Sequence, residues 1–122
     1  MKTILIVDDD KQIATVFQVA LTSAGYKVMT ANDGQSGINM VKQAKFDLVL
    51  LDEMMPDMSG NDVLRSLKED DTTKTTTIVM LSNFGNNDMV KEALDTGAAD
   101  YILKYQVSPT DLPVKVKEIV GE

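Results

Sequence analysis

Residues 3–10 read TILIVDDD, an unbroken apolar run that ends in three adjacent aspartates, Asp8, Asp9 and Asp10. Such a run is typical of a parallel β-strand that is covered on both faces. Four further short runs follow along the chain. Only the first of these four, where Lys27 stands between Tyr26 and Val28, alternates as an edge strand would. We predict strands at Thr3–Val7, Tyr26–Thr30, Asp47–Leu51, Thr77–Leu81 and Asp100–Leu103.

Segments with helical spacing separate and follow these runs. The first keeps i, i+3, i+4 spacing and ends at Gly25, and the fourth ends at Gly97. Parallel strands need right-handed crossovers, so five such units predict one doubly wound α/β domain with strand order 2-1-3-4-5 and five helices. The expected apolar faces are Ile13, Val16, Phe17, Ala20, Leu21 and Ala24; Ile38, Val41 and Ala44; Val63, Leu64 and Leu67; Met89, Val90, Ala93 and Leu94; and Leu112, Val116, Ile119 and Val120.

Composition narrows the possible functions. The 122 residues suit one domain spanning 1–122. The 19 acidic and 12 basic residues, a net charge of −7, argue against direct nucleic-acid binding. No apolar stretch is long enough to span a membrane and the start turns acidic too soon for a signal peptide, so we expect no membrane association and a cytoplasmic location. Without histidine or cysteine, any chemistry must use carboxylates, hydroxyls, amines and a hard metal ion.

Polar residues stand at the ends of the apolar runs. Asp8 and Asp9 follow the first run, Asp52 follows the third, Ser82 the fourth and Lys104 the fifth. The carboxyl ends of parallel strands meet at one edge of a sheet, so these side chains are expected to converge. Adjacent carboxylates repel unless a cation is present, and oxygen ligands suit Mg²⁺. Singly, each residue has a simpler reading as a helix cap, turn or solvated residue; together they fit phosphoryl transfer.

Four motifs then carry a resemblance. IVDDD, DLVLLDEMMPDMSG, MLS and GAADYILK, beginning at residues 6, 47, 80 and 97, resemble in order and spacing the bacterial two-component response regulator receiver domains of the single-domain, chemotaxis-regulator type. The resemblance implies a flavodoxin-like fold. It also implies a signal-transduction phosphoprotein that accepts a phosphoryl group from a histidine kinase or a histidine phosphotransfer protein in a phosphorelay and acts on a downstream protein target. No independent metabolic activity is expected beyond its own aspartyl phosphorylation and dephosphorylation.

The resemblance also implies roles in the acidic pocket. Asp52 matches the phosphoacceptor. Asp9 and Asp52, with the backbone carbonyl of Met54, match direct ligands of Mg²⁺ (or Mn²⁺). Asp8 matches a residue that acts on the metal mainly through coordinated water.

Further positions match the part of the family that responds to phosphorylation. Ser82 and Lys104 match residues that bind phosphoryl oxygens, and Tyr101 matches an aromatic switch that turns inward. The implied output surface comprises the fourth helix, fifth strand and fifth helix. We hypothesise that Met54 and Phe84, bulky and apolar beside the site, restrict attacking water and prolong the phosphorylated state.

The chain departs from the family pattern at several positions. Tyr105 stands where a cis proline commonly follows the lysine, which predicts a trans bond after Lys104. Asn83 replaces a small residue, and its bulk is expected to hinder access of the phosphoryl group. Pro113 falls inside the last predicted helix, which is expected to begin late or to kink, while Ser108 and Pro109 suit an N-cap and the first helical position.

Two other functions remain open from the sequence. Asp8-Asp9-Asp10 contains the D-x-D of haloacid-dehalogenase-like phosphatases, in which Asp8 would be the nucleophile and Asp10 the acid–base, with Ser82 and Lys104 in supporting roles. That reading leaves the motif around Asp52 unexplained and normally needs a longer chain. The other alternative is a phosphorylation-independent adaptor that keeps only the fold.

Overall fold

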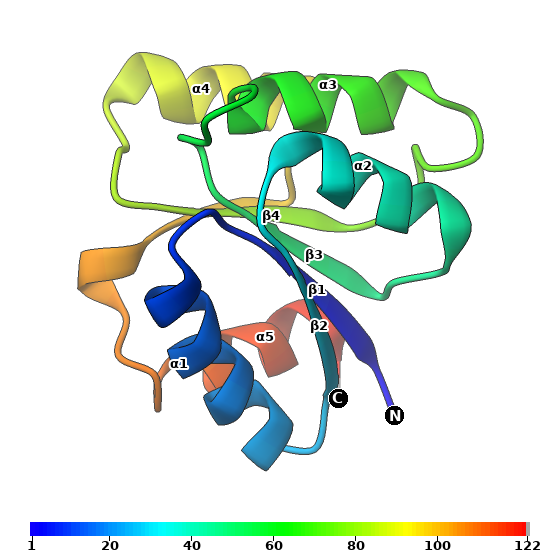
Figure 1. Cartoon of the computed structure of the whole chain (residues 1–122). Coiled ribbons are helices and arrows are strands. Elements are labelled where there is room, and N and C mark those ends of the chain that lie inside the picture. The colour runs from blue at the N-terminus through cyan, green and yellow to red at the C-terminus, as the bar shows by residue number, and fades with distance from the viewer. Residues whose placement is uncertain (122) are drawn as a thin grey trace.

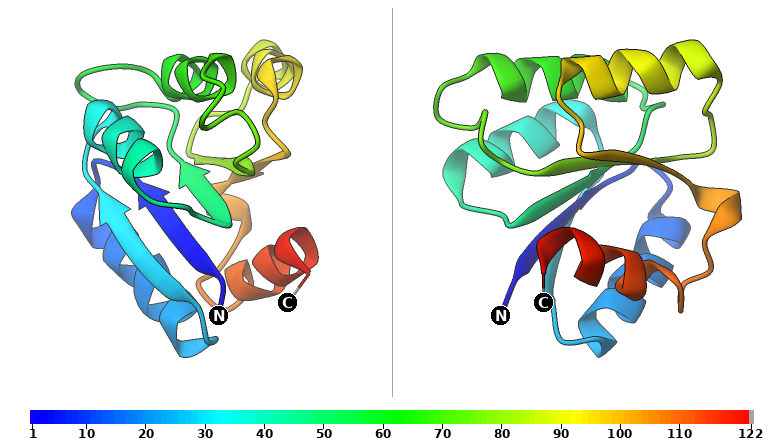
Figure 2. Two further views of the ribbon diagram at one scale, coloured as in Figure 1. Left: turned by 90° about the vertical axis from the view of Figure 1, so that its right-hand side faces the viewer. Right: turned by 180° about the vertical axis from the view of Figure 1, so that it is seen from behind.

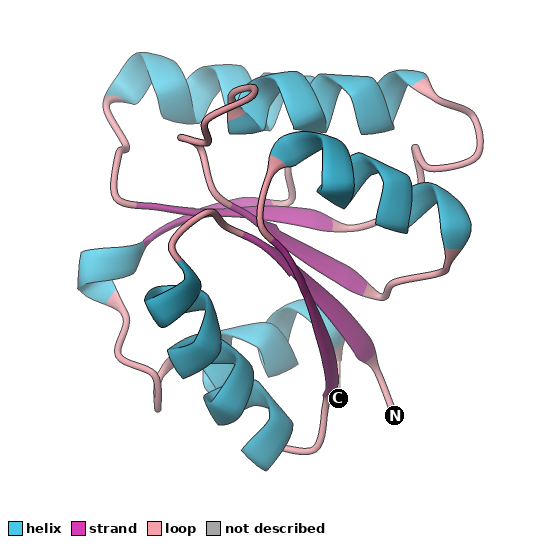
Figure 3. Ribbon diagram, in the orientation of Figure 1, coloured by secondary structure: helices cyan, strands magenta, loops and turns pink. Residues whose placement is uncertain are grey.

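A single parallel sheet forms the centre of the structure, a computed structural model that describes residues 1–121. Its strand order is β2-β1-β3-β4-β5, which confirms the prediction, and helices cover both faces (Figures 1 and 3). The strands are β1 (Thr3–Val7), β2 (Lys27–Ala31), β3 (Leu48–Leu51), β4 (Ile78–Ser82) and β5 (Asp100–Leu103). The helices are α1 (Lys11–Ser23), α2 (Gly34–Gln43), α3 (Gly60–Glu69), α4 (Asn87–Thr96) and α5 (Leu112–Val120), with a short 3₁₀ helix, η1, at Lys104–Gln106.

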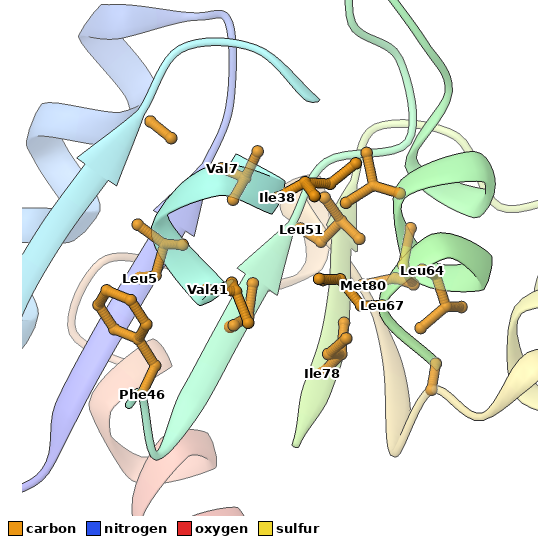
Figure 4. Packing of buried hydrophobic residues seen from close by; sticks show 14 of the residues in the cluster. Leu5, Val7, Ile38, Val41, Phe46, Leu51, Leu64, Leu67, Ile78 and Met80 are labelled. Carbon is orange, nitrogen blue, oxygen red and sulfur yellow. The ribbon is translucent and has the colours of Figure 1, made fainter. Parts of the chain in front are cut away.

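Helices lie on both faces of the sheet (Figure 2). Two apolar clusters hold these layers together, one on each face of the sheet. Successive residues of β1 point to opposite faces, so Leu5 joins one cluster and Ile6 the other. The first cluster packs under α2, α3 and α4, and Figure 4 shows Val41 and Leu64 within it. The second packs against α1 and α5. Burying each such side chain contributes about 1.5–3 kcal/mol, which offsets the conformational entropy lost on folding.

Element ends differ from the predictions by about one residue. The second strand runs over Lys27–Ala31 rather than Tyr26–Thr30, because the Tyr26 N–H donates to the Leu21 carbonyl and so completes the turn that ends α1. That turn needs Gly25, whose φ of 102° few other residues adopt. β3 and β4 also begin one residue later than predicted, and Ser82 is the last residue of β4 rather than the residue after it.

The predicted apolar faces of three helices were too wide. Val16 of α1 is 48% exposed and Leu94 of α4 is 45% exposed, whereas Ala14 is buried. Ala24 and Ala44 also lie outside the core, as the exposed C-caps of α1 and α2. Helical spacing identifies the side of a helix that faces the sheet, but the width of the contact depends on how closely the layers approach.

The last helix begins late, as the proline predicted. α5 starts at Leu112, with Pro113 in its first turn, where a missing N–H costs little. The prediction that Ser108 and Pro109 cap and begin this helix is wrong. They belong to the turn that precedes α5, in which the Ser108 hydroxyl accepts from the Asp111 N–H at 3.2 Å.

The strand register determines where the functional residues lie. Val7 lies opposite Leu51, and Ser82 lies opposite Leu103, so the residues that follow these positions gather at one edge of the sheet. The Lys104–Tyr105 peptide bond at this edge is trans, as predicted. None of the helices within residues 1–121 has the length and apolar character needed to cross a bilayer.

Candidate functional site

Three carboxylates meet at the carboxyl edge of the sheet. The backbone fixes two of them, because the Asp52 N–H donates to the Val7 carbonyl at 2.9 Å and the Asp8 N–H to the Ala31 carbonyl at 3.0 Å. One carboxylate oxygen from each of Asp8, Asp9 and Asp52 lies within 4.8 Å of the other two. Asp8 and Asp52 are buried, and Asp9 is exposed to solvent. The predicted convergence of these aspartates is therefore confirmed.

Lys104 brings a buried positive charge to the same place. It begins η1, directly after β5, and only 8% of its surface is exposed. Its Nζ lies 2.5 Å from Asp8 Oδ2 and 3.5 Å from Asp52 Oδ1. A buried ammonium needs such partners, since water does not solvate it there.

Even with this lysine, negative charge exceeds positive charge in the pocket. Burial and the neighbouring Asp8 raise the pKa of Asp52 from 3.8 to about 6, with a smaller contribution from Asp9, although Lys104 acts in the opposite direction. Carboxylates that repel one another in this way become ionised together when a cation sits between them. Their oxygen donors fit a hard divalent cation, so the acidic triad is able to bind a metal ion.

Asp10, the third aspartate of the run, has a different task. Its Oδ1 accepts from the Gln12 and Ile13 N–H groups at 3.1 and 3.2 Å, which makes it the N-cap of α1. Its own N–H donates to Asp8 Oδ1 at 2.9 Å and so helps to orient Asp8. The Asp10 carboxylate thus serves the helix and is outside the triad.

Ser82 and Tyr101 are joined through the backbone of Phe84. The fully buried Ser82 hydroxyl accepts from the Phe84 N–H at 3.1 Å, and the Tyr101 hydroxyl donates to the Phe84 carbonyl. Burial raises the pKa of Tyr101, with a further contribution from Glu53, while a hydrogen bond with the Ser82 side chain lowers it. Tyr101 is half-buried against the first apolar cluster, and its hydroxyl reaches the loop that follows β4. The side chains of Phe84, Met54 and Asn83 are exposed on the loops that leave β4 and β3.

The loop between β3 and α3 is tightly closed. The Gly60 N–H donates to the Glu53 carbonyl at 2.7 Å, and Met54 forms a bridge with Ser59, which caps α3. A Cβ atom on Gly60 would lie 2.3 Å from the Asp52 carbonyl oxygen, so only glycine allows this approach. The loop therefore holds the backbone of Met54 close to Asp52.

Sequence reasoning missed the behaviour of Glu53. It is 4% exposed, its Oε1 accepts from the Asn61 N–H at 3.4 Å, and burial raises its pKa. In the sequence, Glu53 stands beside Asp52 in an acidic motif and resembles an exposed charged residue. No local pattern distinguishes a buried glutamate from an exposed one at this position. The signal that could have found it is its position directly before a shaped loop that ends in glycine.

Comparisons with known proteins agree with this geometry. Residues 4–117 match the family model described as "Response regulator receiver domain". The phosphate regulon transcriptional regulatory protein PhoB of Pseudomonas aeruginosa is 40% identical over 119 residues, which cover 98% of this chain and 52% of that protein. The chain spans about half the length of the curated relatives it matches.

Solved structures show the same fold. A CheY-like response regulator receiver domain protein from Methanospirillum hungatei superposes with a TM-score of 0.92 at 31% identity, over 99% of this chain and 94% of that one. The chemotaxis protein CheY4 of Vibrio cholerae superposes with a TM-score of 0.90 at 28% identity, over 98% of each chain. With the acidic triad in place at the strand ends, the chain belongs to the response regulator receiver domains, the phosphoacceptor signalling domains of two-component systems.

Proposed function

We propose that Asp52 is the residue that accepts the phosphoryl group, from a phosphohistidine on a histidine kinase or a histidine phosphotransfer protein. One observation carries this assignment: Asp52 directly follows the central strand β3, with Asp8, Asp9 and Lys104 around its carboxylate. In the transfer, an Asp52 oxygen forms a bond to phosphorus as the phosphorus–nitrogen bond to the imidazole breaks. The electron pair of that bond stays on the imidazole nitrogen.

The acidic triad and the loop after β3 would hold the metal. Asp9, Asp52 and the backbone carbonyl of Met54 would be its direct ligands, and Asp8 would act through coordinated water. Mg²⁺ or Mn²⁺ suits these oxygen donors, and when bound it supplies positive charge that offsets the charge of the transferred group. Lys104 supplies a second positive charge, and its contact with Asp8 keeps it beside Asp52.

The response to phosphorylation is proposed to begin at Ser82 and Lys104, which would bind phosphoryl oxygens. Because Ser82 and Tyr101 both bond to Phe84, a movement of the Ser82 hydroxyl changes the environment of Tyr101. Tyr101 belongs to β5, so the surface of α4, β5 and α5 is the proposed output face. Its target is proposed to be a protein, since the net charge of −7 disfavours direct contact with nucleic acid. The proposed location is the cytoplasm.

The alternative functions have less support. A phosphatase of the D-x-D type needs the carboxylate of Asp10 at the reacting atoms, yet that carboxylate caps α1. A phosphorylation-independent adaptor would not need three carboxylates that lie close enough together to bind one metal ion. We therefore favour phosphoryl acceptance over both.

Labelling with acetyl phosphate tests the assignment. Wild-type protein with Mg²⁺ is expected to gain one phosphoryl group, detected by intact mass, and to lose this ability with EDTA or in Asp52→Asn. Peptide mapping after borohydride reduction should place the label on Asp52. A label on Asp8 would favour the phosphatase, and failure of the wild type to take any label would favour the adaptor.

The output face is tested separately by NMR. Amide shifts are compared with and without beryllofluoride, which mimics the phosphoryl group. Shifts that extend from Ser82 through Tyr101 to α4 and α5 are expected. Shifts confined to the loops around the acidic triad would refute this route.

A further inference from the structure

The loop that follows Asp52 is attached to a helix from another part of the chain. Asp57, in the middle of this loop, accepts from the Gly34 N–H through Oδ1 at 2.9 Å and from the Gln35 N–H through Oδ2 at 3.0 Å. Gly34 and Gln35 are the first two residues of α2, whose N–H groups have no partner within the helix. Figures 1 and 2 show the loop curving beside the first turn of α2.

The contact is supported by close packing. A Cβ atom on Gly34 would lie 2.3 Å from Cγ of Met58, the residue after Asp57, so the loop rests directly on the helix backbone. The two hydrogen bonds lower the pKa of Asp57, which means that they favour its ionised form. Two charge-assisted bonds from one carboxylate restrict both the position and the rotation of the group.

This attachment completes the support of the loop. Its ends are already fixed by the Glu53–Gly60 hydrogen bond and by the bridge between Met54 and Ser59. Without Asp57, the residues between those ends would be held by side-chain packing alone, chiefly of Met55 and Met58 against the first apolar cluster. The loop carries the Met54 carbonyl, so its rigidity bears on the metal site.

We infer that Asp57 is a positioning residue: by bonding to the first turn of α2 it holds the β3–α3 loop in the shape that presents the Met54 carbonyl to the metal. The inference rests on the proposed function only in its use of Mg²⁺. It assigns to Asp57 a role beyond capping, because it links two connections that both lie at the carboxyl edge of the sheet. Residues that orient metal ligands from outside the coordination sphere commonly affect metal affinity strongly.

Asp33 provides a matched control. It caps the same helix, accepting from the Ser36 N–H at 2.8 Å, but it makes this contact within α2 rather than with the loop. Asp33→Ala and Asp57→Ala each remove one negative charge and one partner of the same helix end. Both substitutions are expected to lower the melting temperature. If Asp57 only stabilised the helix end, the two variants would therefore change Mg²⁺ affinity equally.

Two measurements distinguish the roles. Titration calorimetry with Mg²⁺ should show affinity falling roughly ten-fold in Asp57→Ala and staying within about two-fold of wild type in Asp33→Ala. Hydrogen exchange in EDTA should show faster exchange of the Gly60 amide in Asp57→Ala only. Asp57→Asn, which keeps one acceptor oxygen, should fall between, and it replaces the alanine variant if that variant does not fold.

The inference is overturned if Asp57→Ala and Asp33→Ala change Mg²⁺ affinity equally, or if the loop amide exchanges at the wild-type rate in Asp57→Ala. Failure of the wild type to bind Mg²⁺ would refute the proposed metal site instead. In that case the exchange measurement still decides whether Asp57 holds the loop.

Discussion

Replacing Asp52 with asparagine is expected to stabilise the metal-free protein, although it removes the proposed phosphoacceptor. The pKa of Asp52 rises on folding from 3.8 to about 6, through burial first and then repulsion by Asp8. A carboxyl with a raised pKa binds its proton more tightly in the folded chain, so its ionised form opposes folding. The difference between the two pKa values corresponds to about 3 kcal/mol of unfolding free energy. Asparagine carries no charge and avoids this cost.

The advantage of the variant depends on pH with a definite sign. At about pH 8, Asp52 is ionised in the folded and unfolded chains alike and the full cost of about 3 kcal/mol applies. At about pH 5 the folded carboxyl is largely protonated, and roughly half of that cost remains. Stability tied to this group is therefore lost as pH rises through the folded pKa of about 6.

Denaturant unfolding followed by circular dichroism, in EDTA at both pH values, measures the effect. The variant should exceed wild type by about 3 kcal/mol at the higher pH, equivalent to roughly 10 °C in melting temperature. Asp71→Asn removes the same charge from a side chain that is 91% exposed and should change little. Saturating Mg²⁺ should favour wild type and narrow the gap. An Asp52→Asn variant that is less stable than wild type in EDTA, or whose gain does not depend on pH, would refute the reasoning.

Four other substitutions test three separate parts of the site. Lys104→Met leaves Asp8 without its 2.5 Å partner, so unfolding free energy in EDTA should fall by about 3 kcal/mol and recover largely with Mg²⁺; equal losses with and without the ion would contradict this. Gly60→Ala forces a Cβ against the Asp52 carbonyl and should cost about 2 kcal/mol or more in a thermal melt, and a neutral result would show that the loop adapts. Met54→Asn and Phe84→Glu place polar groups beside the site and should speed phosphoryl loss about ten-fold in a decay assay, whereas unchanged rates would rule out control of the lifetime by these residues.

The sequence predicted the pocket well because the parallel topology brings the residues that follow the strands to one edge of the sheet. Continuous apolar runs identify buried strands, and residues directly after such runs must share one edge of the sheet. That is why the sequence alone places Asp8 and Asp52 side by side, although they are far apart in the chain. Lys104 was predicted to reach the same edge, although its choice of Asp8 as the closer partner depends on the path of η1.

Some features of the structure are not marked by any local pattern in the sequence. The two bonds of Asp57 join residues 23 and 22 positions apart, and no periodicity marks such a pairing. Val16 fits the apolar face of α1 by spacing, yet it is 48% exposed while Ala14 and Phe17 on either side of it are buried. Tyr26 is of a residue type common in strands, but its N–H donates to the Leu21 carbonyl at the end of α1. The first case is a tertiary contact, whereas in the other two the geometry of α1 and of the turn that ends it overrides the local apolar pattern.

Both faces of β1 and β3 are apolar, which leaves their alignment weakly specified by hydrophobicity alone. A strand that slid by one residue would still present apolar side chains to both layers. Asp8 and Asp52 remove this freedom, because sliding β1 by one position would bring Asp8 level with Leu51, inside the apolar sheet. These carboxylates thus fix the register of the central strands. A redesign that exchanged them for apolar residues would gain local stability and lose the feature that selects one alignment over its neighbours.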